Sequence, residues 1–282
     1  AATAAAAAAA AAAGVAGTVA CAGEPRPPQP AVQGGAASAN GPGQDGSWRR
    51  NLLFLPPSGF WSDAAWYDLQ MDRRLPETAS ALRELIWALP PLSGQRVADF
   101  GSGSGRCAAA LAAAYPRARL TLLDVDTERG EMALRQLRRQ AEAGGVEDTA
   151  ATARFIPCVL AADGSRLPGA SDEGSEGYDC VVAMQAVRHV VAPAAHYASK
   201  HGLAVVRGEA EVREGYRKVL RGMFESLTPG GHVFIGDHVV HGHPGVFEHC
   251  QLLLEAGFQE VDIAWRVKDW FVVGARKPLA AA

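Results

Sequence analysis

From residue 96 onward, short apolar runs alternate with stretches in which apolar positions recur every three or four residues. The first pattern predicts buried β-strands, and the second predicts amphipathic helices that pack on them. The predicted strands are 96–100, 120–124, 153–160, 178–184, 232–236, 261–267 and 270–275, and the predicted helices are 106–115, 128–143, 216–226 and 247–256. Strands that alternate with helices form a parallel sheet. The short link Lys268-Asp269 makes the last two strands an antiparallel hairpin.

The chain before this core divides into two parts. Residues 1–47 are poor in large apolar side chains and contain the alanine run Ala4–Ala13, so we expect a disordered extension. Their scarcity of acids leaves an organelle-targeting remnant as the alternative. The chain starts on alanine rather than methionine, as a fragment or a processed form would. Residues 48–95 predict a helical cap, with one helix near 61–71 and another over 77–89.

An insert, Val190–Glu214, interrupts the alternation after the fourth strand. We predict a loop with a short helix that closes over an active site as a lid, because the insert carries several polar side chains: His196, Tyr197, Lys200 and His201. A surface excursion without catalytic consequence is the alternative. The expected organisation is thus an extension, a cap, and a core over 96–278 that contains this insert.

A glycine loop follows the first strand and reads Asp99-Phe100-Gly101-Ser102-Gly103-Ser104-Gly105. Glycine adopts positive φ at little cost and lets the backbone come close to a ligand. The helix that begins behind the loop offers free N–H groups. Asp124 ends the second strand, where a carboxylate can hydrogen-bond a ribose. This combination predicts a site for a nucleotide-like cofactor.

Two cofactor motifs overlap at this loop. Gly103-x-Gly105-x-x-Ala108 fits the dinucleotide fingerprint, which would indicate an NAD(P)-dependent oxidoreductase. The longer frame, Asp99-x-Gly101-x-Gly103-x-Gly105, resembles the first motif of class I S-adenosylmethionine-dependent methyltransferases. Asp99 favours the second interpretation, because a carboxylate can hold that cofactor's amino group but would repel a pyrophosphate. Glycines that serve packing alone are a third interpretation.

Further segments resemble the same methyltransferase family and occur in the family's order: YDCVVAMQAVRH over 178–189, LTPGG over 227–231 and EAGF over 255–258. Arg188-His189 stands where small-molecule methyltransferases have His-His. The resemblance implies an α/β fold, a doubly wound, mostly parallel seven-stranded sheet with a C-terminal antiparallel hairpin, and S-adenosyl-L-methionine as cofactor. The implied cofactor-binding residues are Asp99, Gly101, Ser102, Gly103, Gly105, Asp124 (ribose), Val125 (adenine), Asp163 and Gly164 (adenine amino group), and Gln185.

Histidines near the ends of the fourth and fifth strands are candidates for catalysis, since ligands of such sheets bind at the carboxyl ends of the strands. His189 is the predicted general base because histidine titrates near neutral pH, and a packing role is the alternative. His238 is the second candidate. Together with His241, His243 and the pair His249-Cys250, His238 could also suggest zinc, but the spacing matches no helix-face pair and we predict no metal.

Composition excludes several classes of protein. The 27 Lys and Arg against 30 Asp and Glu give a net charge of −3, which argues against a nucleic-acid partner. The five cysteines are scattered, as expected for a reducing compartment, either the cytoplasm or an organelle. No run of about 18 strongly apolar residues occurs, so we predict no membrane span.

A missing motif narrows the choice of acceptor. Met184-Gln185-Ala186 follows the fourth strand, in the place of the Asn/Asp-Pro-Pro-aromatic motif that accompanies transfer to exocyclic base amines. We therefore predict methyl transfer to a small molecule. A cofactor-binding module that has lost catalysis and serves interactions is the remaining alternative. Neither the accepting atom nor the oligomeric state follows from the sequence.

Overall fold

The computed structural model describes residues 75–142, 152–159, 164–171, 177–193, 198–199, 201–203, 205–206 and 208–280. All of them belong to one compact unit of the chain. The predicted extension over 1–47, the predicted helix near 61–71 and Asp163 lie outside the described residues. The division into extension, cap and core therefore stays a prediction.

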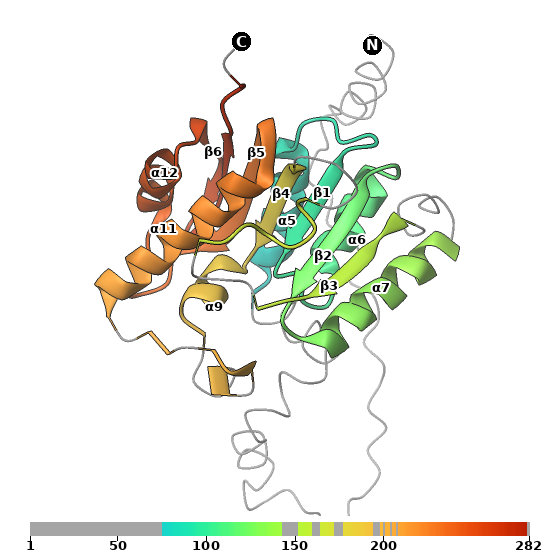
Figure 1. The fold of residues 1–282 in the computed structure, drawn as a ribbon, viewed down its shortest axis with the longest axis horizontal. Helices are drawn as coiled ribbons and strands as arrows, with labels where there is room; N and C mark the ends of the chain where they lie inside the picture. The colour runs from blue at the N-terminus through green and yellow to red at the C-terminus, as the bar shows by residue number, and fades with distance from the viewer. Residues whose placement is uncertain are drawn as a thin grey trace, which may run out of the picture. The chain divides into compact units, whose positions relative to one another are not determined.

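Seven strands form one sheet in the order β3-β2-β1-β4-β5-β7-β6 (Figure 1). β1 to β5 pair in parallel, and β7 lies antiparallel between β5 and β6. The strands are β1 (Arg96–Phe100), β2 (Arg119–Asp124), β3 (Arg154–Pro157), β4 (Tyr178–Met184), β5 (Leu227–His238), β6 (Gln259–Val267) and β7 (Trp270–Arg276). This confirms the predicted doubly wound sheet with its C-terminal hairpin.

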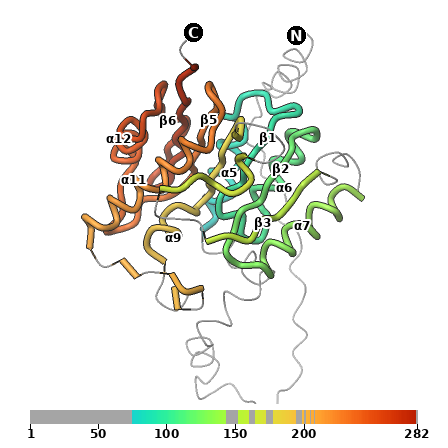
Figure 2. The backbone as a smooth tube through the Cα atoms, in the orientation of Figure 1, coloured from blue at the N-terminus to red at the C-terminus, as the bar shows by residue number. Residues whose placement is uncertain are grey.

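Helices cover both faces of the sheet (Figure 2). One face carries α5 (Glu77–Ala88), α6 (Arg106–Ala114) and α7 (Thr127–Glu142), and the other carries α9 (Val187–Val191), α11 (Glu209–Ser226) and α12 (Val246–Glu255). Neighbouring residues of the central strand β4 serve the two cores: Val181 is buried with Leu220 of α11, and Val182 with Leu111 of α6. Burial on both faces explains why the sequence of β4 is a nearly continuous apolar run.

The predicted start of α11, at residue 216, is wrong by seven residues, because the helix begins at Glu209. Gly215 breaks the helical pattern in sequence, but in the fold it permits close packing. A Cβ at this position would lie 2.5 Å from Cγ1 of Val191 in α9. The predicted insert, 190–214, therefore overlaps α9 at one end and α11 at the other. Its proposed role as a lid stays a prediction.

Two strand boundaries also differ from the sequence-based ones. β5 begins at Leu227 rather than at residue 232, so the segment predicted as a turn belongs to the strand. Its register against β4 shifts between Tyr178 and Cys180, and this irregularity accommodates Thr228-Pro229-Gly230-Gly231 within the ladder. β3 is shorter than predicted and covers only Arg154–Pro157. None of the helices within the described ranges is long and apolar enough to cross a bilayer.

Gly222 provides a test of the packing of α11. Its Cβ would lie 2.5 Å from the backbone carbonyl oxygen of Ser165, which cannot move aside easily. We predict that Gly222→Ala lowers the free energy of unfolding by about 1–3 kcal/mol, the usual cost of overpacking, although alanine favours the helix by about 1 kcal/mol. Urea unfolding measures this change.

Gly215→Ala in the same helix is the matched control. It should cost less than Gly222→Ala because only the side chain of Val191 has to shift. A Gly222→Ala protein that is as stable as the wild type would contradict the packing described for α11.

Candidate cofactor and acceptor site

The loop after β1 consists of glycines in left-handed conformations. Gly101, Gly103 and Gly105 have φ values of +70°, +51° and +90°. The N–H groups of Gly101 and Ser102 both donate to the carbonyl oxygen of Leu123 in β2, at 2.8 and 3.1 Å. These bonds hold the loop against the end of the neighbouring strand.

The three glycines serve different purposes. A Cβ on Gly101 would lie 2.4 Å from Cβ of Ala186, and one on Gly105 would lie 2.6 Å from Cβ of Ala133. Both positions need glycine for close packing. A Cβ on Gly103 would meet only the carbonyl oxygen of Gly101, at 4.0 Å, and would otherwise enter open space. Gly103 is therefore the glycine whose backbone a ligand can approach.

Asp99 lies near the end of β1 with 1% of its surface exposed. Neither carboxylate oxygen has a hydrogen-bond partner among the described residues. Burial raises the pKa of Asp99 to about 7, although the Cys107 thiol and the Ala108 N–H face the carboxyl and lower the pKa in part. These two donors form no hydrogen bond of normal geometry, and a buried carboxylate without one is costly in the free protein. A cationic amino group would supply the missing partner.

Asp124 ends β2 and is also buried. Its carboxylate accepts hydrogen bonds from the N–H groups of Gly103, at 2.8 Å, and Asp126, at 2.9 Å. Burial raises the pKa of Asp124, and these two backbone bonds lower it in part. Each carboxylate oxygen can accept a further bond, so Asp124 remains able to bind a ribose. The Oγ atom of Ser102 is buried and has no described hydrogen-bond partner.

The other predicted cofactor residues are placed less directly. Val125 follows β2 and is half-buried. A Cβ on Gly164 would lie 3.6 Å from the carbonyl oxygen of Lys218 in α11. Gln185 has a φ of +54° and adjoins Ala186, which contacts the glycine loop. Contacts of Val125, Gly164 and Gln185 with a cofactor stay predictions.

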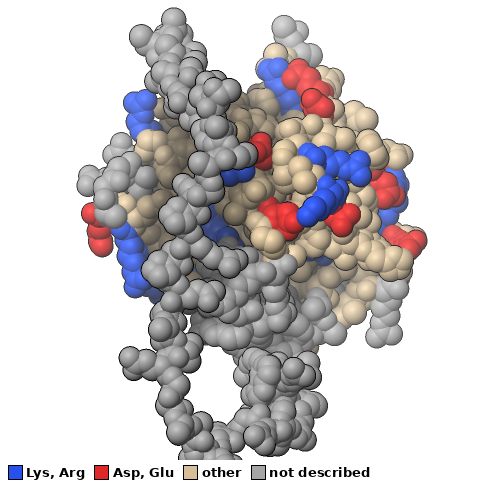
Figure 3. Space-filling model, turned by 180° about the vertical axis from the view of Figure 1, so that it is seen from behind, with Lys and Arg blue, Asp and Glu red and all other residues tan. Residues whose placement is uncertain are grey.

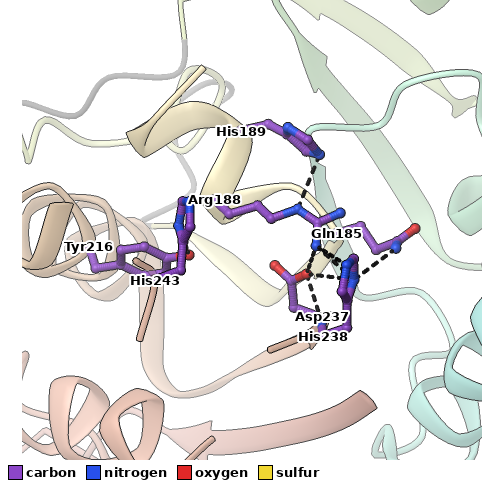
Figure 4. A network of polar contacts seen from close by, with 7 residues as sticks. All are labelled: Gln185, Arg188, His189, Tyr216, Asp237, His238 and His243. Atoms are coloured by element: carbon purple, nitrogen blue, oxygen red, sulfur yellow. Dashed lines mark hydrogen bonds and ion pairs between the residues drawn. The ribbon is translucent and has the colours of Figure 1, made fainter. Parts of the chain in front are cut away.

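A second group of polar side chains lies at the ends of β4 and β5 (Figure 4). Arg188 Nη1 contacts Oδ1 of Asp237 at 2.9 Å and Nδ1 of His238 at 2.7 Å. Arg188 Nε donates to Nε2 of His189 at 3.2 Å. Gln185 Nε2 lies 3.4 Å from Nδ1 of His238. The cluster therefore joins the two strands through one guanidinium group.

The histidines of this cluster are neutral near pH 7. Crowding by protein atoms and the charge of Arg188 lower the pKa of His189 to about 3, although the residue as a whole is exposed. Burial and Arg188 lower the pKa of His238 to about 4. They also lower the pKa of His243, whose Nδ1 lies 3.3 Å from the Tyr216 hydroxyl. Neutral imidazoles can accept protons, but with such pKa values they are weak bases.

Sequence reasoning missed the two charged centres of this cluster. In the sequence, Arg188 stands out only as a departure from the His-His motif, and no motif assigns a role to Asp237. A signal existed for Asp237, because this charged residue directly follows the predicted buried strand 232–236. Within the described ranges, no three His, Cys, Asp or Glu side chains are arranged to hold a metal ion.

Comparison with known proteins agrees with this geometry. Residues 77–156 match a family model described as the methyltransferase small domain. The chain is also 43% identical over 63 residues to ribosomal RNA small subunit methyltransferase C of Hahella chejuensis. That match covers 22% of this chain and 17% of the relative.

Solved structures agree on the fold. The S-adenosylmethionine-dependent methyltransferase SibL superimposes with a TM-score of 0.50 at 20% identity, over 77% of this chain and 62% of SibL. An O-methyltransferase family protein from Burkholderia thailandensis gives a TM-score of 0.50 at 14% identity, over 83% of this chain and 69% of that protein. The chain has the fold of class I methyltransferases, and residues 77–156 match the methyltransferase small domain. This agrees with the predicted family, enzyme class and cofactor, S-adenosyl-L-methionine.

The methyltransferase domain has groups that fit this cofactor. The partnerless carboxylate of Asp99 suits its amino group, the open space at Gly103 suits its close approach, and Asp124 suits its ribose. The family match ends at residue 156 and so covers β1 to β3. The polar cluster at the ends of β4 and β5 lies outside it.

Gly103 tests the location of the cofactor. We predict that Gly103→Val weakens binding of S-adenosylhomocysteine more than 30-fold in isothermal titration, because the side chain enters the open space beside the loop. Gly94→Val is the matched control, since Gly94 also has positive φ, at +81°, and nothing within 4 Å of its Cβ position. Both variants carry similar backbone strain. Equal affinities in the two variants would refute the placement.

Asp99 gives a prediction with a defined pH dependence. Its ordinary pKa is 3.8, and burial raises it to about 7 in the folded state. Between these values the folded protein keeps a proton that the unfolded chain has lost. The free energy of unfolding of the cofactor-free protein should therefore fall as the pH rises from about 4 to about 7. Asp99→Asn should reduce this fall and be more stable than the wild type at pH 8.

The same variant should bind S-adenosylhomocysteine more weakly, by about 1.5–3 kcal/mol, the range for hydrogen bonds to charged groups. Unfolding curves at pH 4 and pH 8, together with titration of the cofactor product, measure both effects. Asp262→Asn is the control, because Asp262 lies on the exposed strand β6. If the free energy of unfolding of Asp99→Asn depended on pH as in the wild type, Asp99 would not be the group that causes this dependence.

Proposed function

We propose that this protein transfers a methyl group from S-adenosyl-L-methionine to a small-molecule acceptor. The observation that carries the proposal is the buried carboxylate of Asp99, which lacks a partner beside a loop that is open at Gly103. The polar cluster around Arg188 lies at the same edge of the sheet and offers groups for an acceptor.

The bound cofactor would supply an activated methyl group on its sulfonium sulfur. The protein would align the acceptor with the methyl–sulfur bond and exclude water, and alignment can supply much of the acceleration. The acceptor's lone pair would form the new bond to the methyl carbon, and the electrons of the broken carbon–sulfur bond would return to sulfur. Any acceptor proton would go to Nε2 of His189, our proposed base, because Nε2 accepts from Arg188 Nε and Nδ1 therefore carries the hydrogen of the neutral ring. The hydrogen bond from Arg188 would open for this transfer. Crowding by protein atoms and the charge of Arg188 lower the pKa of His189 and make it a weak base.

An RNA acceptor is the second candidate, because the relative from Hahella chejuensis is named as a ribosomal RNA methyltransferase. Two observations favour a small molecule. Met184-Gln185-Ala186 stands at the end of β4, in place of the motif associated with base amines. On the face drawn in Figure 3, acidic and basic side chains are interspersed over the described residues, whereas RNA binding favours a concentrated basic surface.

An oxidoreductase is less well supported. A dinucleotide pyrophosphate beside the glycine loop would lie close to the carboxylates of Asp99 and Asp124. The antiparallel β7 between β5 and β6 also matches the methyltransferase arrangement rather than an all-parallel dinucleotide-binding sheet.

Two measurements test the proposal. We predict that the full chain binds S-adenosylhomocysteine in isothermal titration and does not bind NAD at tenfold higher concentration. With methyl-labelled S-adenosylmethionine, label should enter a small-molecule extract rather than purified small ribosomal subunits. Binding of NAD alone would overturn the proposal. Labelling of the subunits alone would replace the small-molecule acceptor by RNA, and cofactor binding without any transfer would favour the non-catalytic module.

A further inference from the structure

The guanidinium group of Arg188 lies on the acceptor side of the site. Asp99 lies on β1 and the glycine loop follows this strand, whereas Arg188 reaches Asp237 and His238 on β5, beyond the intervening β4. Neighbouring strands lie about 4.8 Å apart, so β5 is roughly 10 Å from β1. The guanidinium group therefore stands across β4 from the groups that fit the cofactor.

Its hydrogen-bonding capacity is only partly used. Nε donates to His189, and Nη1 contacts Asp237 and His238. Nη2 has no hydrogen-bond partner among the described residues. The side chain is 11% exposed, and Figure 4 places the guanidinium group between His189 and the Gln185–His238 pair. An edge of a largely buried guanidinium group thus remains available for an acceptor.

The surroundings hold this edge in place. Asp237 is 2% exposed, and its Oδ1 accepts both from Arg188 and from the backbone N–H of His238, at 2.8 Å. The imidazole of His238 also stacks on Trp270, with ring centroids 4.7 Å apart. Asp237 is therefore a positioning residue for Arg188. The stacked ring gives the cluster one flat wall.

We infer that Arg188 determines acceptor specificity by binding a negatively charged oxygen group, such as a carboxylate, on the acceptor. A guanidinium fork matches such a group in shape and charge. The inference rests on the proposed methyl transfer. A carboxylate could also come from the methionine part of the cofactor, and the experiment has to separate the two sources. The position of Arg188 on the β5 side favours the acceptor.

The test uses matched pairs of probes on the full chain saturated with S-adenosylhomocysteine. Each pair is a hydroxybenzoate and the corresponding hydroxybenzamide, which differ in charge and little in shape. Isothermal titration should show that at least one hydroxybenzoate binds at least tenfold more tightly than its amide. Arg188→Met should lose this preference, and Arg188→Lys should keep part of it because it keeps the charge.

Two controls interpret the result. Arg213→Met removes an arginine that pairs with Glu248 and Glu255 and should leave the preference unchanged. Affinity for S-adenosylhomocysteine should stay within threefold in every variant. The preference for the hydroxybenzoate over its amide is measured on the wild-type protein alone. It therefore tests the inference even if Arg188→Met does not fold.

Three outcomes would overturn the inference. The first is a wild-type protein that binds no hydroxybenzoate, or that binds acid and amide equally. The second is an Arg188→Met protein that keeps the preference but loses S-adenosylhomocysteine binding more than tenfold, which would assign Arg188 to the cofactor's carboxylate. The third is a wild-type protein that does not bind S-adenosylhomocysteine at all, which refutes the proposed function itself.

Discussion

The contact between the loops after β1 and β4 is the constraint on which both halves of the site depend. One half is the glycine loop with Asp99 and Asp124, and the other is the polar cluster around Arg188. Gly101 and Ala186 approach so closely that a Cβ on the glycine would lie 2.4 Å from the alanine Cβ. This contact brings the end of β4 against the glycine loop. Gln185 adjoins Ala186, and Arg188 follows two residues later with its guanidinium group directed toward Asp237 and His238 of β5. A larger residue at either position would separate the two halves.

Both halves bury polar groups that a stable core would avoid. Asp99, Asp237 and Ser102 each have a buried side-chain oxygen without a described hydrogen-bond partner. Such groups lower stability unless a partner is supplied. Their positions at the carboxyl ends of β1 and β5, and in the loop after β1, agree with the general location of ligand sites in open α/β sheets. We therefore expect cofactor binding to raise the free energy of unfolding, because the cofactor would supply hydrogen-bond partners to these oxygens.

Similarity to known proteins covers only one of the two halves of the site. The family match over 77–156 covers the strands and the loop that fit the cofactor. The cluster of Arg188, Asp237 and His238 lies beyond it and combines one charged pair with neutral imidazoles. Chemistry of the acceptor therefore has to be argued from this cluster itself.

The sequence by itself determined the sheet, its hairpin, and the roles open to Asp99 and Gly103, because these depend on local periodicity and on residues a few positions apart. Only the tertiary structure decided the start of α11, since Gly215 is explained by Val191 in another helix. It also decided the pairing of Arg188 with Asp237, which are 49 residues apart. Contacts between residues far apart in the chain do not affect the hydrophobic periodicity. They can therefore be identified only once the strands and helices are placed beside one another in the fold.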